Sequence, residues 1–296
     1  MKLLAIIGET VREARARKTL IGVFIFSSIM IVIAVLIFQM DVVKSNAGRH
    51  TGDVFHGRPR NSENKSEQLT PEQTQRIQAA LLVSVEDTIG SGVAQLLYFF
   101  TVCVGIFATA GLITSIMEKG TIDLMLSKPV PRWLYIVGRY LGAVLIIFCE
   151  VAYFIGGLWV AAGISFSGWS PNLLLCIPYV TLGFAGIYAV VVLIGVLWRS
   201  SWLAIILGIT IYFITGVIIP ALEYLDKTLN GGNETGPFTI VAQILHWSLP
   251  QVSDISHNMG QMMFHQPVEV VPIFATLGLI AVYLGLSSFV FSKKEF

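Results

Sequence analysis

The 296 residues are 55% hydrophobic and only 12% charged, and 19 Lys and Arg against 18 Asp and Glu give a formal net charge of +1. Soluble proteins average about 45 to 50% apolar and about 25% charged residues, so this composition indicates an integral membrane protein. The near-neutral charge argues against a nucleic-acid partner, because phosphate binding requires concentrated Lys and Arg. The three cysteines lie in apolar runs without C-x-x-C spacing, which excludes the usual cysteine metal frameworks.

The chain begins with an amphipathic stretch at residues 1–18, MKLLAIIGETVREARARK. We expect a cytoplasmic helix that lies along the inner headgroups, with its apolar stripe in lipid and its basic side chains near anionic phosphates. A solvated basic flank that only sets the topology is the alternative. The stripe is Leu3, Ile7, Val11 and Ala14, and the basic residues are Arg12, Arg15, Arg17 and Lys18.

Six apolar segments are long enough to cross a bilayer core of about 30 Å, which needs about 20 helical residues. We therefore predict an all-α polytopic membrane protein with six transmembrane helices. The first segment is not a cleavable signal peptide, because its apolar run is longer than about 7 to 15 residues and no A-x-A-like site follows it. The predicted spans are residues 19–40, 93–117, 141–165, 173–198, 202–222 and 270–291.

The distribution of Lys and Arg sets the orientation of these spans. The basic residues concentrate in the shorter loops, so we expect a multi-pass protein of the cell's inner membrane with a cytoplasmic N-terminus and a cytoplasmic tail at 292–296. Two long extracytoplasmic segments then remain, at 41–92 and 223–269. The first carries a helix start signal near its middle, and the second contains FTIVAQILHW (238–247), which predicts a re-entrant or interfacial helix.

Residues 118–140 separate the second and third predicted spans and are too polar to continue either of them. Ile122 and Leu126, one turn apart, share a helix face. Pro131 can begin a fresh helix that runs through Arg132 into the third span. We expect a short cytoplasmic helix, held at both ends by spans, that transmits force when a partner docks on it. An interfacial hairpin without that role is the alternative.

The same segment carries a resemblance to a known family. EKGTIDLMLSKPVPRWLYIVGRYLGAVL (118–145) resembles the E-x-G-T-x-x-x-L-L-S-x-P-[VI]-x-R element and the following G-K/R-x-L-G stretch of ABC-2 type permeases, and ETVREARARKTLIGVF (9–24) resembles their N-terminal connecting helix. Met125 stands where a leucine is commoner, and the 41–92 loop is longer than in many members. The residues that the resemblance assigns to ATPase coupling are Glu118, Gly120, Thr121, Ile122, Asp123, Leu126, Lys128, Pro129 and Arg132.

This resemblance implies the permease subunit of an ABC transporter, acting as an exporter. It implies a homodimer or heterodimer of permeases, each docked by its coupling helix into a cytoplasmic ABC ATPase that binds ATP and Mg. The chain itself contains no Gly-Lys dipeptide and hence no G-x-x-x-x-G-K-[ST] loop, so we expect no enzyme activity and no cofactor in it. Two other interpretations stay open: a gradient-driven carrier, and a membrane scaffold or sensor whose outer loops bind an extracytoplasmic partner protein.

Glu150 is the only acidic or basic side chain within the six predicted spans. A charge near the bilayer centre costs at least about 2.5 to 3.5 kcal/mol, so we expect this side chain to face the protein interior. Three roles fit it: a substrate-path contact, the proton site of a carrier, or a hydrogen bond to a Ser, Thr or Tyr of a neighbouring span.

The outer run HNMGQMMFH contains soft ligands suited to Cu(I). The helical spacing of its methionines explains the same residues as one face of an amphipathic helix, so we predict no metal site. The weak candidates for metal binding are His257, Met259, Met262, Met263 and His265.

Overall fold

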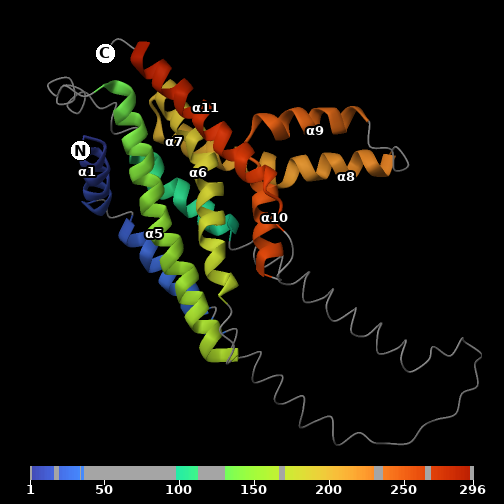
Figure 1. Cartoon of the computed structure of the whole chain (residues 1–296), viewed down its shortest axis with the longest axis horizontal. Helices are drawn as coiled ribbons and strands as arrows, with labels where there is room; N and C mark the ends of the chain where they lie inside the picture. The colour runs from blue at the N-terminus through green and yellow to red at the C-terminus, as the bar shows by residue number, and fades with distance from the viewer. Residues whose placement is uncertain are drawn as a thin grey trace, which may run out of the picture.

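The computed structural model describes residues 2–16, 20–33, 35–36, 98–112, 131–166, 171–229, 236–263 and 268–293, and within these ranges every regular element is a helix. The helices form an elongated bundle from which one helical pair projects sideways (Figure 1). They are α1 (Lys2–Ala16), the helices Leu20–Ile33 and Tyr98–Leu112, α5 (Arg132–Phe166), α6 (Asn172–Trp198), α7 (Ser201–Phe213), the π-helical turn η2 (Ile214–Ile218), α8 (Ile219–Leu229), α9 (Pro237–Ser248), α10 (Val252–Met263) and α11 (Val271–Lys293).

Four helical stretches of the described residues are long and apolar enough to cross a membrane: Trp133–Ala161, Asn172–Trp198, Ser201–Asp226 and Val271–Lys293. A fifth arises if Leu3–Ala16 and Leu20–Ile33, which meet at 71°, count as one bent span. Four of the six predicted spans are thus present as helices of sufficient length. The predicted spans at 19–40 and 93–117 are described only in part.

α6 is the central helix of the bundle, and it packs against α5, α7, α10 and α11. In its most apolar stretch 83% of the residues are buried, against 11% for α11. A helix that is apolar on all sides is stable in the interior, where every side meets other protein. Gly183 lets a neighbour approach closely, because a Cβ there would lie 1.6 Å from the Tyr98 hydroxyl.

α5 begins where the sequence predicts a fresh helix that leads into the third span. It starts at Arg132, directly after Pro131, and continues without a break for 35 residues. The predicted boundary between the cytoplasmic segment 118–140 and the span 141–165 falls inside this continuous helix. Proline disfavours helix in the residue before it but suits the entrance of a new helix, so Pro131 ends the connection and the amide of Leu134 bonds to its carbonyl at 3.1 Å.

The fifth predicted span also extends further, since helix continues from α7 through η2 into α8 and the candidate span reaches Asp226 rather than 222. Pro220, the second residue of α8, lacks an N–H, and its ring would clash with the carbonyl four residues earlier. That carbonyl lies in η2, where the helix is widened into a π-turn that accommodates the proline.

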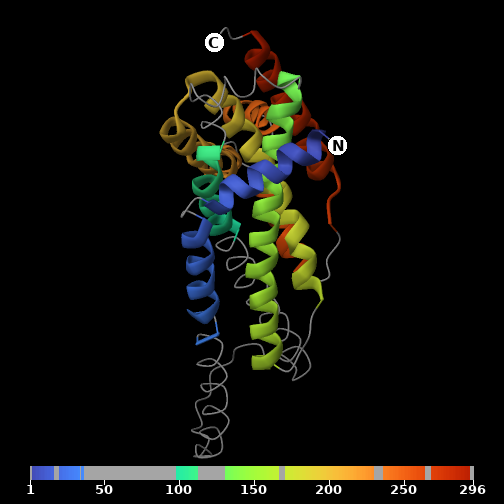
Figure 2. The same cartoon turned by 90° about the vertical axis from the view of Figure 1, so that its left-hand side faces the viewer.

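α8 and α9 pack side by side and project away from the bundle (Figure 1). The carboxylate of Asp226 accepts hydrogen bonds from the amide of Thr239, at 3.0 Å, and from its hydroxyl. α9 covers the apolar stretch 238–247, which is a helix as predicted. At the other side of the molecule, α1, the beginning of α5 and the end of α11 lie toward the same end of the bundle (Figure 2).

Candidate functional site

The candidate site lies where α1 crosses the beginning of α5. α1 buries Ile6, Thr10 and Ala14, at 5%, 0% and 1% exposure, against α5. A Cβ on Gly138 would lie 2.7 Å from Ile6 Cγ2, and one on Gly142 would lie 2.7 Å from Thr10 Cβ. The two glycines, one helical turn apart, thus give α5 a flat surface on which α1 rests directly.

The predicted helix at the N-terminus is present, and the face that it buries against α5 differs from the predicted apolar stripe. Ala14 belongs to the buried face, whereas Val11 is exposed at 37%. The buried face is rotated toward Ile6 and Thr10 because a compact threonine fits the glycine surface, and its hydroxyl is satisfied by the carbonyl of Ile6 at 2.9 Å. This face packs on protein rather than on lipid.

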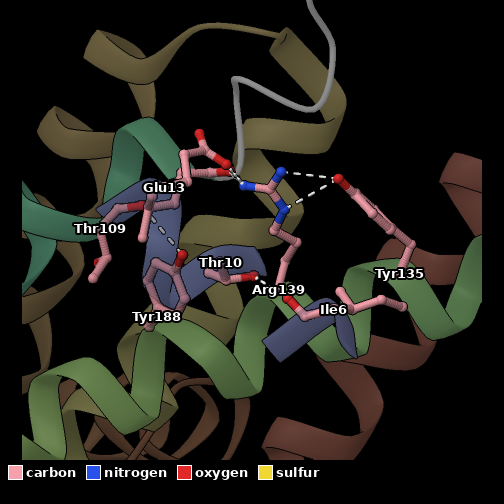
Figure 3. A network of polar contacts seen from close by, with 8 residues as sticks. Ile6, Thr10, Glu13, Thr109, Tyr135, Arg139 and Tyr188 are labelled. Carbon is pink, nitrogen blue, oxygen red and sulfur yellow. Dashed lines mark hydrogen bonds and ion pairs between the residues drawn. The ribbon is translucent and has the colours of Figure 1, made fainter. Parts of the chain in front are cut away.

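Arg139 is the polar centre of this junction (Figure 3). Its side chain is buried, with 2% exposure for the residue. It donates to the carboxylate of Glu13 on α1, to the Tyr135 hydroxyl at 3.3 Å from Nε and 2.9 Å from Nη2, and to the carbonyl of Leu112 at 3.4 Å. We call these four residues the Arg139 cluster. A buried charge is tolerated when it is paired and hydrogen-bonded, and this guanidinium is both.

Aromatic side chains support the cluster from α6. The Tyr188 ring stacks on Tyr140 and on Phe184, with centroids 5.7 and 5.3 Å apart. The Tyr188 hydroxyl bonds to the carbonyl of Thr109 at 3.2 Å, and the Tyr140 hydroxyl to that of Ala185 at 2.8 Å. These bonds join α5, α6 and the helix Tyr98–Leu112 into one packed unit behind the cluster.

Glu150 lies deeper along α5 and is 2% exposed. The Ser27 hydroxyl donates to its Oε1 at 2.6 Å, and Oε2 has no hydrogen-bond partner in the described part of the chain. One turn further, the hydroxyls of Ser28 and Tyr153 lie 2.8 Å apart. Of the three predicted roles, the geometry matches the hydrogen bond to a serine of a neighbouring helix.

Glu150 is not the only charged side chain in the apolar helices. Arg139 lies within the candidate span Trp133–Ala161, because α5 starts before the predicted third span. The sequence prediction placed Arg139 in the cytoplasmic segment 118–140 and did not single out Glu13 or Tyr135. The four-residue spacing of Tyr135 and Arg139 is the one local signal that pairs them, since such residues share a helix face.

Most of the predicted coupling residues lie outside the described residues: those from Glu118 to Pro129 are not covered, and Arg132 is the first residue of α5. Arg12 and Arg15 are exposed on α1, while Arg17 and Lys18 also lie outside the described ranges. The proposed partner-binding loop 41–92 is likewise not covered.

Of the five weak candidates for metal binding, the structure describes the side chains of His257, Met259 and Met262. His257 is exposed, whereas Met259 is 2% exposed in the core. The carbonyl of Met262 accepts a bond from Asn172 at 3.1 Å. Met263 ends α10 and His265 is outside the described ranges. Among the described residues no three His, Cys, Asp or Glu side chains are grouped so as to hold a metal ion.

Comparison with known proteins agrees with this membrane architecture. Residues 4–296 match the family model described as ABC-2 family transporter protein. The chain belongs to the ABC-2 transporter family. It is therefore a multi-pass membrane permease subunit of an ABC transporter, and membership of this family implies a cytoplasmic ABC ATPase as partner. A search of the curated proteins gives no match.

Proposed function

We propose that this permease couples its helices to ATP hydrolysis through the segment 118–131, which docks on a separate cytoplasmic ATPase, and that it acts in export. The observation that supports coupling is the position of Arg139. Its side chain joins α5, to which it belongs, with the last turn of the helix Tyr98–Leu112 and with Glu13 of α1. α5 and the helix Tyr98–Leu112 are the helices on either side of the segment 118–131, and α1 is the third helix that Arg139 contacts.

A guanidinium presents five donors in a fixed planar fork, so moving one of its partners disturbs the bonds to the others. A push on the segment would then reach α1, α5 and the helix Tyr98–Leu112 together, as one unit. ATP and Mg would be bound by the ATPase. This chain would supply the translocation path together with a second permease, identical or related, as the resemblance to ABC-2 permeases implies.

The proposal places α1 and both termini on the cytoplasmic side, and thiol labelling tests that orientation. Cysteine introduced at Ser62 should react with an impermeant maleimide added from outside, and cysteine introduced at Ser127 should react only after the membrane is opened. The reverse pattern would put the segment on the wrong side for an ATPase and remove the coupling proposal.

The test of coupling itself is Leu126→Asp. A carboxylate placed in a pocket shaped for an alkyl side chain costs a few kcal/mol, about the size of an interface hot spot. We expect normal membrane levels, loss of ATPase copurification and loss of ATP-driven transport. Ser127→Asp is the matched control, because the neighbouring position points about 100° away on a helix and adds the same charge.

Unchanged copurification and transport in Leu126→Asp would mean that the segment is only an interfacial hairpin. Equal losses in both variants would mean that added charge, rather than a specific contact, disrupts the complex. Both results contradict the proposed coupling face.

A further inference from the structure

A groove of about 830 Å³ lies between α1, the helix Leu20–Ile33 and α5. Its size falls in the range of about 300 to 1,000 Å³ that is usual for ligand sites. Its walls are mainly branched apolar and aromatic side chains, such as Ile25 and Ile29 from one helix and Leu145 from another. Arg15, in the last turn of α1, is the one charged residue among those that line the groove in the described part of the chain.

The groove lies beside the contacts that hold the helix Leu20–Ile33 most tightly to α5. The attachment to α5 is made by Ser27, which bonds to Glu150, and by Ile31, whose Cδ1 would lie 2.5 Å from a Cβ on Gly157. Ile25 and Ile29 point elsewhere and are 55% and 52% exposed. The groove is therefore not a packing defect of the helix pair but an uncovered apolar face beside it.

The one charged group among the described lining residues, Arg15, lies at one end of the groove. Arg15 is exposed, and no carboxylate of the described residues forms an ion pair with it. The hydroxyl of Ser28, further along the wall, is engaged by the carbonyl of Phe24 at 2.7 Å and by Tyr153. A ligand that fits this lining has an anionic group at one end and a long apolar body.

The length of the groove agrees with that description. From residue 20 to residue 33 a helix rises by about 20 Å, somewhat more than the roughly 15 Å of one leaflet's hydrocarbon. A cation at the end nearest α1 would lie at headgroup depth, where anionic lipids gather around basic side chains of the cytoplasmic leaflet. A helix of a second copy would instead have to bring an acidic side chain to Arg15.

We propose that this groove binds one anionic glycerophospholipid, with its phosphate on Arg15 and an acyl chain along Ile25 and Ile29. Bound there, the lipid bridges α1 and the helix Leu20–Ile33, two elements that meet at 71°. The site rests on the proposed cytoplasmic placement of α1 but not on the ATPase contact. Lipid retention and ATPase copurification are therefore separate measurements, and one can fail without the other.

The test uses the full chain reconstituted with equal amounts of phosphatidylglycerol and phosphatidylcholine that share the same acyl chains. After purification in mild detergent, native mass spectrometry counts the lipids retained per permease. We expect one retained phosphatidylglycerol per chain, and a fall of about fivefold in its binding constant, read from occupancy over a lipid titration, for Arg15→Gln, the factor that corresponds to one cation beside an anionic surface. Arg12→Gln, which removes an exposed charge from the same helix outside the groove, should leave the occupancy unchanged.

A second pair of variants tests the apolar part. Ile25→Trp fills the groove and should abolish retention, whereas Phe26→Trp, at an exposed neighbour outside the lining, should not. A phosphatidylglycerol with a diazirine in its acyl chain should cross-link to the stretch 145–149 of α5 in the wild type but not in Ile25→Trp.

Three results would overturn the site. Equal retention of phosphatidylcholine would indicate an ordinary lipid shell, and equal losses for Arg12→Gln and Arg15→Gln would indicate diffuse charge. The third result has two parts: no lipid is retained, and a photoreactive residue at position 25 cross-links to protein. It would assign the groove to a second copy or to another segment of this chain.

Discussion

Two helix junctions of the bundle are built from different chemistry. At the α1 junction, α1 rests on Gly138 and Gly142 and is fixed by the buried charge of Arg139. At the α10 junction, where α6 begins, neutral amides bond to backbone. Asn258 donates to the carbonyl of Glu269 at 2.7 Å and accepts from its amide at 3.2 Å, and Asn172 bonds to Met262.

The difference decides how each junction responds to movement. A neutral amide that loses a backbone partner leaves an ordinary unsatisfied group. A buried guanidinium that loses its carboxylate leaves an uncompensated charge, so the α1 junction is either fully formed or strongly disfavoured. A device that transmits force needs that all-or-none property, whereas a junction that only holds helices together does not.

The largest effect is expected for Arg139→Met. The substitution keeps an unbranched side chain but removes the bonds to Glu13, Tyr135 and Leu112 at once, so we expect a destabilisation on the order of 3 kcal/mol. The melting temperature of the purified permease should fall, and trypsin should cleave α1 faster at Arg12 and Arg15. ATP-driven transport should be lost.

A double-mutant cycle separates the charge pair from the rest of this effect. If Arg139 acts through Glu13, the variant Arg139→Met with Glu13→Gln should be destabilised by clearly less than the sum of the two single changes. If the two changes in stability were strictly additive, Arg139 would not act through Glu13. The α1 junction would then depend on packing alone and would not differ from the α10 junction in its use of charge.

Gly142→Val tests the packing half of the same junction. The added side chain begins 2.7 Å from Thr10 Cβ, so α1 must move away, at a cost of about 1 to 3 kcal/mol. Gly156→Val on the same helix is the matched control, since a Cβ there meets nothing within 4 Å. Cross-linking between cysteines placed in α1 and α5 should weaken only in the first variant, and equal effects would sink the idea of a glycine-dependent contact.

The sequence predicted the central helices well and the α1 junction poorly. The span at 173–198 agrees with α6, Asn172–Trp198, because a continuous apolar run bounded by Pro171 and Arg199 leaves little freedom in its ends. The start of α5 agrees with the helix start predicted at Pro131, whereas the burial of Arg139 depends on partners that the local sequence does not identify.

The site depends on contacts between distant parts of the chain. Arg139 is buried because Glu13, 126 positions earlier, packs over it, and no local pattern reveals such a pairing. For Glu150 one of the three roles that the sequence left open, a bond to a hydroxyl of a neighbouring span, agrees with the structure. It did not identify Ser27, whose position follows from helix packing.

Asn258→Leu probes the α10 junction and should have a smaller effect on transport than the changes at the α1 junction. It removes two hydrogen bonds to the backbone of Glu269, and we expect a loss of about 1 to 3 kcal/mol in stability. Transport per folded molecule should stay near the wild-type value, because no charge is left unpaired. His257→Leu, at the exposed neighbour, serves as the control and should change stability by less than about 0.5 kcal/mol. If Asn258→Leu lowered transport per folded molecule as much as the α1-junction variants do, the two junctions would not differ in their role in transport.

The smallest effect is expected for Glu150→Gln, which asks whether the middle of α5 also requires a charge. The amide oxygen of glutamine can accept the bond that Ser27 now donates at 2.6 Å, so the contact between the two helices survives without a carboxylate. We expect a change in stability below about 0.5 kcal/mol and ATP-driven transport close to that of the wild type. Ser27→Ala, which removes the donor and leaves the buried carboxylate without it, should cost more, about 1 to 3 kcal/mol. If Glu150→Gln instead abolished transport while the protein kept its melting temperature, the carboxylate would have a role in the transport cycle. The requirement for charge would then extend beyond the α1 junction into the membrane-spanning part of α5.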